Sequence, residues 1–85
     1  MIVRLLLFAA ARQAAGRSSD TFEVGDDARV ADVLTAASRR FGPAFDDVLT
    51  TSRVWVNGEP ADDTEARVHT NDEVAVLPPV SGGAL

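Results

Sequence analysis

The chain has 85 residues, of which 46% are hydrophobic and 25% charged, so we expect one small folded domain. It contains no cysteine, which excludes disulfides, thiolate nucleophiles and zinc–thiolate sites and suits a reducing cytoplasm, where we expect the protein to act. The net charge is −5 and every basic residue is an arginine, so we expect no nucleic-acid partner, because phosphates require a clustered basic face. No segment is apolar over a membrane-spanning length, so we expect no membrane partner.

The first half of the chain predicts two strands and a helix. Ile2–Ala9 is strongly apolar and predicts a strand, although the same run resembles a cleavable leader peptide. Gly16–Asp20 predicts a turn and Thr21–Val24 alternates, so the first two strands are expected to form a hairpin. Val30–Phe41 then carries apolar residues at helical spacing, and Gly42 followed by a proline ends the helix. A short helical turn is expected over residues 44–49.

The second half returns to strand patterns. A strand is predicted at Arg53–Val56, and the Asn57-Gly58 pair after it is a tight-turn signal. A weak strand is predicted at Ala66–Val68, followed by a turn over His69–Asp72. The last strand is Glu73–Leu77, because the two prolines after it cannot continue a hydrogen-bonded ladder.

This order of elements predicts an α+β domain over residues 1–77, with the helix packed across one face of a mixed sheet. The first and last strands can lie parallel at its centre, joined by a right-handed crossover. The arrangement is the β-grasp, or ubiquitin-like, roll. The expected core comprises Val3, Leu5, Leu7, Val24, Val33, Leu34, Val54, Val56, Val74 and Val76.

Residues 78–85 are expected to form a flexible tail. Pro78 and Pro79 favour an extended polyproline conformation, and eight residues reach roughly 25 Å. Val80 and Ser81 lead to Gly82 and Gly83, which have no side chains and can pass through a narrow channel. Such a tail suits the delivery of a terminal carboxylate into another protein's active site. The alternative is a frayed terminus in which the two glycines have no role.

Several motifs carry a resemblance to a known family. Residues 71–83, NDEVAVLPPVSGG, resemble the end of the MoaD/ThiS sulfur carriers, in which an acidic turn, a strand and a Pro-Pro root precede Gly-Gly. Residues 8–16, FAAARQAAG, are similar to the MoaD-like FAxxRExxG start, with Gln13 in place of the usual glutamate. RVADVL at residues 29–34 and VNGEP at residues 56–60 also resemble family motifs, so the likeness spans the whole chain.

The resemblance implies a sulfur carrier that is not itself an enzyme and that binds no cofactor or metal. An ATP-using enzyme of the ubiquitin-activating type would adenylate the carboxylate of Gly83, and a persulfide or sulfide would convert it to a thiocarboxylate. The thiocarboxylate would then donate sulfur to the sulfur-accepting subunit of molybdopterin synthase. Carriers for cysteine, thiamine or a sulfur-containing natural product remain alternatives, as does a ubiquitin-like binding module without thiocarboxylate chemistry.

Ala84 and Leu85 depart from the family pattern, whose tails usually end at the second glycine. They imply a cleavage site between Gly83 and Ala84, and a JAMM-type zinc metallopeptidase is the kind of enzyme that trims such tails in related systems. A cloning remnant and a carrier that has lost its role are the alternatives.

An apolar patch is expected on the sheet face away from the helix, and we call it the outer patch. It is a candidate partner-binding surface, with Trp55 as an anchor, unless loops cover it or the strands are shifted by one residue. It comprises Leu6, Phe8, Trp55, Ala75 and Leu77.

Asp62, Asp63 and Glu65 form an acidic loop that is either a solvated surface or a contact for a basic partner. His69 lacks a second ligand in the sequence, so no metal site is expected.

Overall fold

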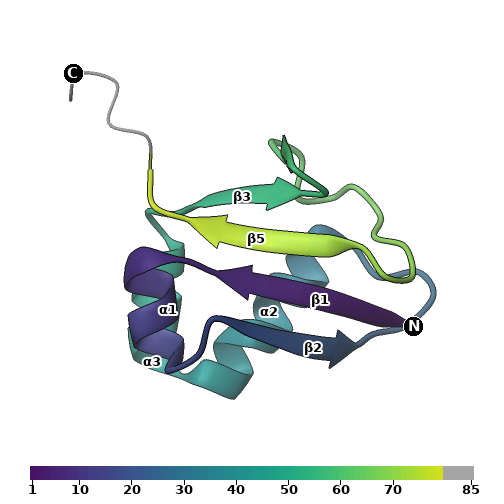
Figure 1. The fold of residues 1–85 in the computed structure, drawn as a ribbon. Helices are drawn as coiled ribbons and strands as arrows, with labels where there is room; N and C mark the ends of the chain where they lie inside the picture. The colour runs from purple at the N-terminus through teal and green to yellow at the C-terminus, as the bar shows by residue number, and fades with distance from the viewer. Residues whose placement is uncertain (80–85) are drawn as a thin grey trace.

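The computed structural model describes residues 1–79 and contains one five-stranded sheet, ordered β2-β1-β5-β3-β4, with three helices (Figure 1). This confirms the predicted α+β β-grasp roll. The elements in chain order are β1 (Ile2–Leu7), α1 (Ala9–Ala15), β2 (Ser19–Glu23), α2 (Val30–Phe41), α3 (Pro43–Leu49), β3 (Arg53–Val56), β4 (Glu59–Pro60) and β5 (Glu73–Leu77).

The pairing of the strands follows the predicted topology. β1 and β5 run parallel in the middle of the sheet, β2 pairs antiparallel with β1, and β3 pairs antiparallel with β5. The β3–β4 turn requires positive backbone angles at both central residues, and Asn57 and Gly58 have φ of 52° and 83°. The sequence signal at this turn therefore has a direct conformational cause.

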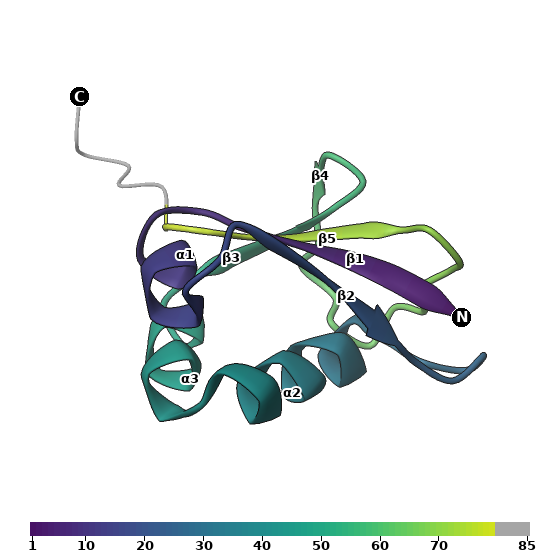
Figure 2. The ribbon, with the colours of Figure 1, turned by 60° about the horizontal axis from the view of Figure 1, so that its bottom comes forward.

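All three helices lie on one side of the sheet (Figure 2). α2 buries Val30, Val33 and Ala37 against the sheet, as its helical spacing predicted. Its first turn is held by Asp32, whose carboxylate accepts a hydrogen bond of 2.8 Å from the backbone N–H of Arg29. Within residues 1–79 no helix covers the other face of the sheet.

The segment after β1 differs from the prediction. β1 and β2 pair antiparallel as expected, but β1 ends at Leu7 and the connection between them contains the helix α1 over residues 9–15, which was not predicted. The chain changes direction at Ala9, which has the left-handed φ of 51°. The alanine-rich sequence of α1 has a high intrinsic helix propensity. The start of the helix has no polar capping residue in the sequence, because the N-cap position is Phe8, whose side chain makes no cap hydrogen bond.

Burial of the predicted core residues is confirmed for those on β1 and β5 and for Val33. Val24, Leu34, Val54 and Val56 are only partly buried and pack at the margin of the core, because they lie near element ends or beside the sheet edge. The sequence reasoning missed several fully buried side chains outside α2. These are Ala11, Phe22, Phe45 and Val68.

The weak strand predicted at Ala66–Val68 is absent. Arg67 makes an isolated bridge with Arg29, and Val68 is buried while its N–H donates to the carbonyl of Ala28. This segment therefore ties the start of α2 to the sheet without joining it as a strand. The edge of the sheet beside β3 is formed instead by the two-residue strand β4, which pairs with the end of β3.

Candidate functional site

The root of the tail lies at the end of the central strand. Leu77 is the last paired residue of β5 and lies opposite Arg53 of β3. The exposed residues Pro78 and Pro79 follow it, and they have no N–H with which to extend the ladder. The predictions for Val80 to Gly83, for the Gly83–Ala84 cleavage site and for a flexible tail lie outside the described residues.

The outer patch is brought together by the strand register. Ala75 of β5 pairs with Leu6 of β1 on one side and with Trp55 of β3 on the other. These three side chains therefore form a row across the sheet on the face away from the helices, because the residues on either side of each point into the core. The one-residue shift that would bury Trp55 beneath the helices does not occur.

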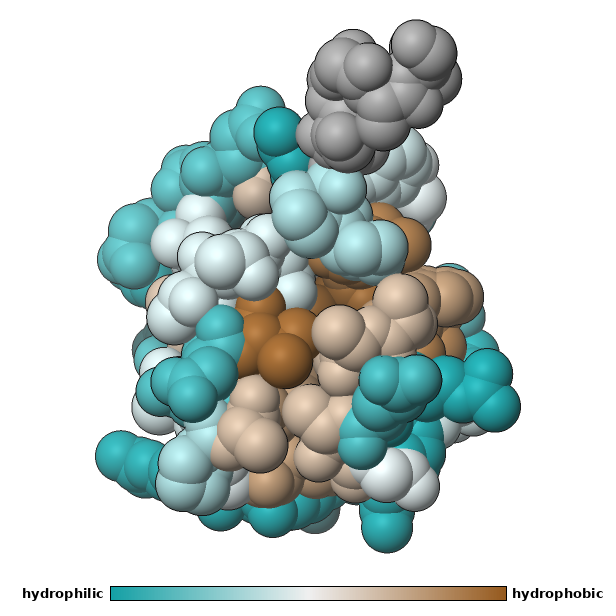
Figure 3. Space-filling model, turned by 90° about the vertical axis from the view of Figure 1, so that its left-hand side faces the viewer, coloured by the Kyte–Doolittle hydropathy of each residue, from teal (hydrophilic) through white to brown (hydrophobic). Residues whose placement is uncertain are grey.

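The other two members extend the patch towards the tail root. Leu77 follows Ala75 by two residues and lies on the same face, and Phe8 is 44% exposed just beyond β1. A hollow beside Trp55 is bounded by the neighbouring Pro60 and by Arg53. Figure 3, which views the end of the molecule where β5 finishes, shows apolar surface filling the centre of that end within a hydrophilic rim. An apolar area at the tail root is the kind of surface that a partner receiving the tail would cover.

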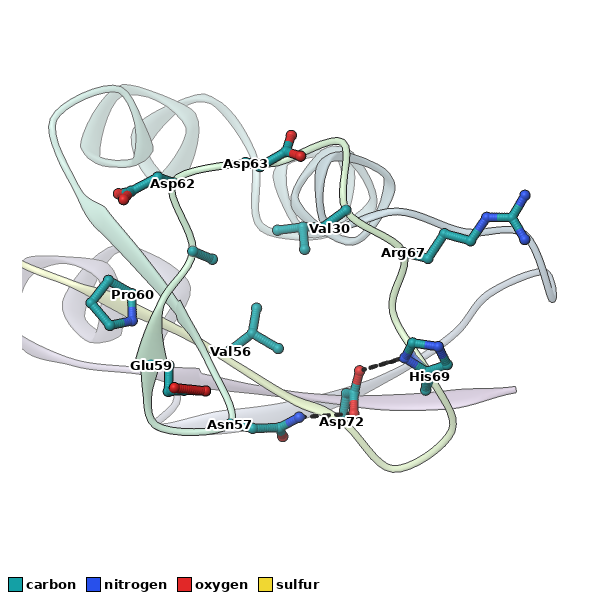
Figure 4. A pocket seen from close by; sticks show the side chains of 12 residues that line it. Val30, Val56, Asn57, Glu59, Pro60, Asp62, Asp63, Arg67, His69 and Asp72 are labelled. Atoms are coloured by element: carbon teal, nitrogen blue, oxygen red, sulfur yellow. Dashed lines mark hydrogen bonds and ion pairs between the residues drawn. The ribbon is translucent and has the colours of Figure 1, made fainter.

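A second hollow lies at the opposite end, between the β3–β4 turn and the segment after β4 (Figure 4). It contains Asp62 and Asp63 of the predicted acidic loop, together with His69 and Asp72. Among the described residues no group of three or more His, Asp or Glu side chains could hold a metal ion. Asp62 also lines the hollow beside Trp55, so the acidic loop adjoins the outer patch at this residue.

Asp72 holds the β3–β4 turn against the start of β5. Its carboxylate accepts hydrogen bonds from the side-chain amide of Asn57 at 2.9 Å and from the backbone N–H of His69 at 2.7 Å. Burial alone would raise the pKa of Asp72. The hydrogen bonds from Asn57 and His69 and the attraction to His69 lower the pKa by more than burial raises it, so the net shift is downward. The side chain thus has a structural role and stabilises the fold in its charged form.

The sequence reasoning placed the members of the outer patch on the correct face but missed its neighbours. Pro60 lies opposite Trp55 only because the two-residue β4 pairs with β3, and strands this short leave almost no sequence signal. Within residues 1–79 no helix is long and apolar enough to cross a membrane.

Together these features define a ubiquitin-like β-grasp protein in which the segment after the central strand starts beside an apolar surface. The sequence model of the ThiS family matches residues 5–83, nearly the whole chain. The chain therefore belongs to the ThiS family, as its motifs indicated. It is 40% identical over 85 residues to a molybdopterin synthase sulfur carrier subunit of Chlamydomonas reinhardtii, covering 98% of this chain and 100% of that protein.

Solved structures agree with this assignment. The crystal structure of SAMP1 from Haloferax volcanii superposes with a TM-score of 0.86 at 31% identity, covering 98% of this chain and 100% of that one. A putative molybdopterin converting factor subunit 1 from Pyrococcus furiosus superposes with a TM-score of 0.85 at 26% identity, covering 94% and 99%. Both likenesses extend over the whole domain, so they confirm the architecture that the sequence predicted.

Proposed function

We propose that this chain is a sulfur carrier subunit, not itself catalytic, that works through a thiocarboxylate on Gly83 and donates sulfur in molybdopterin synthesis. The observation that carries the proposal is the family match to residue 83, combined with 40% identity to a relative named as a molybdopterin synthase sulfur carrier subunit. The outer patch at the tail root supplies the docking surface that such a carrier needs.

The chemistry takes place in a partner's active site. The Gly83 carboxylate attacks the α-phosphorus of ATP, so that an acyl adenylate forms and pyrophosphate leaves. Sulfide then displaces AMP and leaves the thiocarboxylate; if a persulfide supplies the sulfur, a thiol must afterwards cleave the acyl disulfide. This chain contributes the reacting carboxylate, the reach of the tail and the surface that positions both, and ATP is bound by the activating enzyme.

The two residues after Gly83 must first be removed. Two extra residues move a terminal carboxylate about 7 Å further along an extended backbone. A misplacement of about 1 Å can already cost about 10²-fold in rate, so the full chain should be a poor substrate for adenylation. We assign the removal to a peptidase, of which a JAMM-type metallopeptidase is the leading candidate, that hydrolyses the Gly83–Ala84 peptide bond.

The test compares three proteins with an activating enzyme of the ubiquitin-activating type from the same organism. The chain ending at Gly83 should support ATP–pyrophosphate exchange and, with a sulfur source, gain the mass difference between sulfur and oxygen. The full chain should support little exchange, and Gly83→Ala in the trimmed chain should lose most of it, because the added methyl group crowds a channel shaped for glycine. Equal exchange by the full chain, with Ala84 and Leu85 still present afterwards, would refute the trimming step.

A second candidate is covalent attachment of the activated Gly83 carboxyl group to an amine of another protein. It is favoured by the 31% identity to SAMP1 of Haloferax volcanii, a small archaeal modifier protein. The same reaction mixtures distinguish the two functions. A thiocarboxylate on the free chain supports the carrier, whereas a covalent conjugate with a second protein supports the modifier.

A further inference from the structure

The charged side chains are segregated along the direction of the central strands. The tail half is the part of the molecule in which β1 and β5 finish and from which the tail departs, and the far half lies at the other end (Figure 1). The tail half comprises residues 5–22, 33–56, 60–62 and 74–79, because residues 60–62 lie beside residues 53–55 of β3. The far half comprises residues 1–4, 23–32, 57–59 and 63–73.

The far half is strongly acidic. Its segments are tied together by backbone hydrogen bonds, in which the N–H of Val30 donates to Ala66, that of Ala31 to Thr64 and that of Asn71 to Ile2. It carries nine acidic side chains and three arginines, which gives −6 with histidine neutral. Two of those arginines are already in ion pairs, since Arg4 contacts Glu73 at 2.7 Å and Arg67 contacts Asp27 at 3.5 Å.

The tail half has the opposite sign. It carries five arginines and four acidic side chains, which gives +1 in a chain whose net charge is −5. Asp20 is partly buried between Arg17 and Arg40, at 3.0 and 3.1 Å, so its charge is offset locally. Arg12 and Arg39 lie in the last turns of α1 and α2, are exposed, and form no ion pair within residues 1–79.

The two halves adjoin in the middle of β1, but their outer ends are far enough apart to act separately. Six residues of β1 span roughly 20 Å at about 3.3 Å each, whereas the Debye length is about 8 Å at physiological ionic strength. A partner near the tail root therefore interacts mainly with the charges of the tail half, and the charges of the far half are largely screened from it.

We propose that this charge separation orients the chain, tail first, towards an activating enzyme whose tail-receiving site holds the polyanion ATP. The inference rests on the proposed function, because adenylation requires the triphosphate at the point that the tail reaches. The positive tail half is drawn to that site, and the −6 of the far half disfavours approach in the reverse orientation. Steering of this kind raises association rates and weakens steeply with salt.

Two charge reversals of equal size test the proposal. Arg39→Glu changes the tail half and Arg67→Glu changes the far half, and each makes the net charge more negative by two. Both positions are on exposed surfaces away from the outer patch, and circular dichroism confirms that each variant is folded. Arg12→Glu provides a second tail-half variant if Arg39→Glu loses its helix. Each is made in the chain ending at Gly83, and kcat/KM for ATP–pyrophosphate exchange is measured at 20 mM and 500 mM salt. The Debye length is about 20 Å at the lower concentration and about 4 Å at the higher one.

At low salt Arg39→Glu should lower kcat/KM roughly fivefold by raising KM, and this effect should vanish at high salt. Arg67→Glu should change kcat/KM by less than about twofold at low salt. Equal effects of the two variants would overturn the steering, and so would a loss that persists at high salt, because it would indicate a direct contact. In either case activation of the parent chain would leave the proposed function intact. Failure of the parent chain to be activated would instead refute the proposed function and this inference with it.

Discussion

The burial of Phe45 leads to a sharp prediction about stability. Phe45 is fully buried, and its ring centroid lies 5.2 Å from that of Phe41 in an edge-on arrangement. Phe41 in turn lies 6.1 Å from Phe22, so the three rings connect α3, α2 and β2. Phe45→Ala removes a buried aromatic side chain and should lower the free energy of unfolding by about 3–5 kcal/mol. Leu34→Ala, at a partly buried position, should cost only about 1 kcal/mol.

Urea denaturation followed by circular dichroism measures both changes. A domain of this size has a total stability on the order of 5–10 kcal/mol, so Phe45→Ala could be largely unfolded. Phe45→Leu keeps most of the apolar volume but loses the aromatic contacts, and it should cost about 1–2 kcal/mol. If Leu34→Ala destabilises the protein as much as Phe45→Ala does, the packing of α3 described above is wrong.

Three further predictions concern the patch, the turn into α1 and the acid response. Trp55→Ala should leave the fold intact but weaken binding to the sulfur-accepting synthase subunit by roughly 30-fold, measured by calorimetry, if Trp55 anchors the outer patch; unchanged affinity would remove it from the interface. Ala9→Gly should raise the free energy of unfolding by about 0.5–1 kcal/mol, because glycine adopts the positive φ without strain, and a loss of stability would contradict this. The pKa of Asp72 is lowered in the folded state, so its contribution is complete above about pH 4, the value for the unfolded chain, and is lost as the pH falls through the folded pKa. The stability gap between the wild type and Asp72→Asn should therefore close in that acidic window, and a gap independent of pH would refute it.

The parts of the fold that the sequence predicted are those in which local pattern and tertiary packing agree. Alternation in β1 and β5 identified the buried faces correctly because both strands lie in the middle of the sheet with one face under α2. The helical spacing of Val30–Phe41 and the Asn57-Gly58 turn are local signals with a local cause, and both were confirmed.

The sequence predictions failed where contacts between distant segments determine the local structure or the burial of a side chain. α1 follows β1 without a cap or a glycine, and its alanines resemble a continuation of the strand until the backbone reverses at Ala9. Phe22 and Phe45 are buried because α2 and α3 bring them to Phe41, which depends on pairing between distant segments. Residues of the outer patch were placed on the right face because register follows from the same alternation, whereas Pro60 was missed because β4 is only two residues long.

The central claim is that Gly83 becomes the terminal, sulfur-bearing residue of the mature protein. Intact mass spectrometry of the protein isolated from its native cells tests it most directly, because the mass reports both the last residue and the replacement of one carboxylate oxygen by sulfur. The proposed function predicts a population that ends at Gly83, part of it as the thiocarboxylate. A protein that retains Ala84 and Leu85 throughout, with no sulfur added, in cells that are making molybdopterin would contradict it.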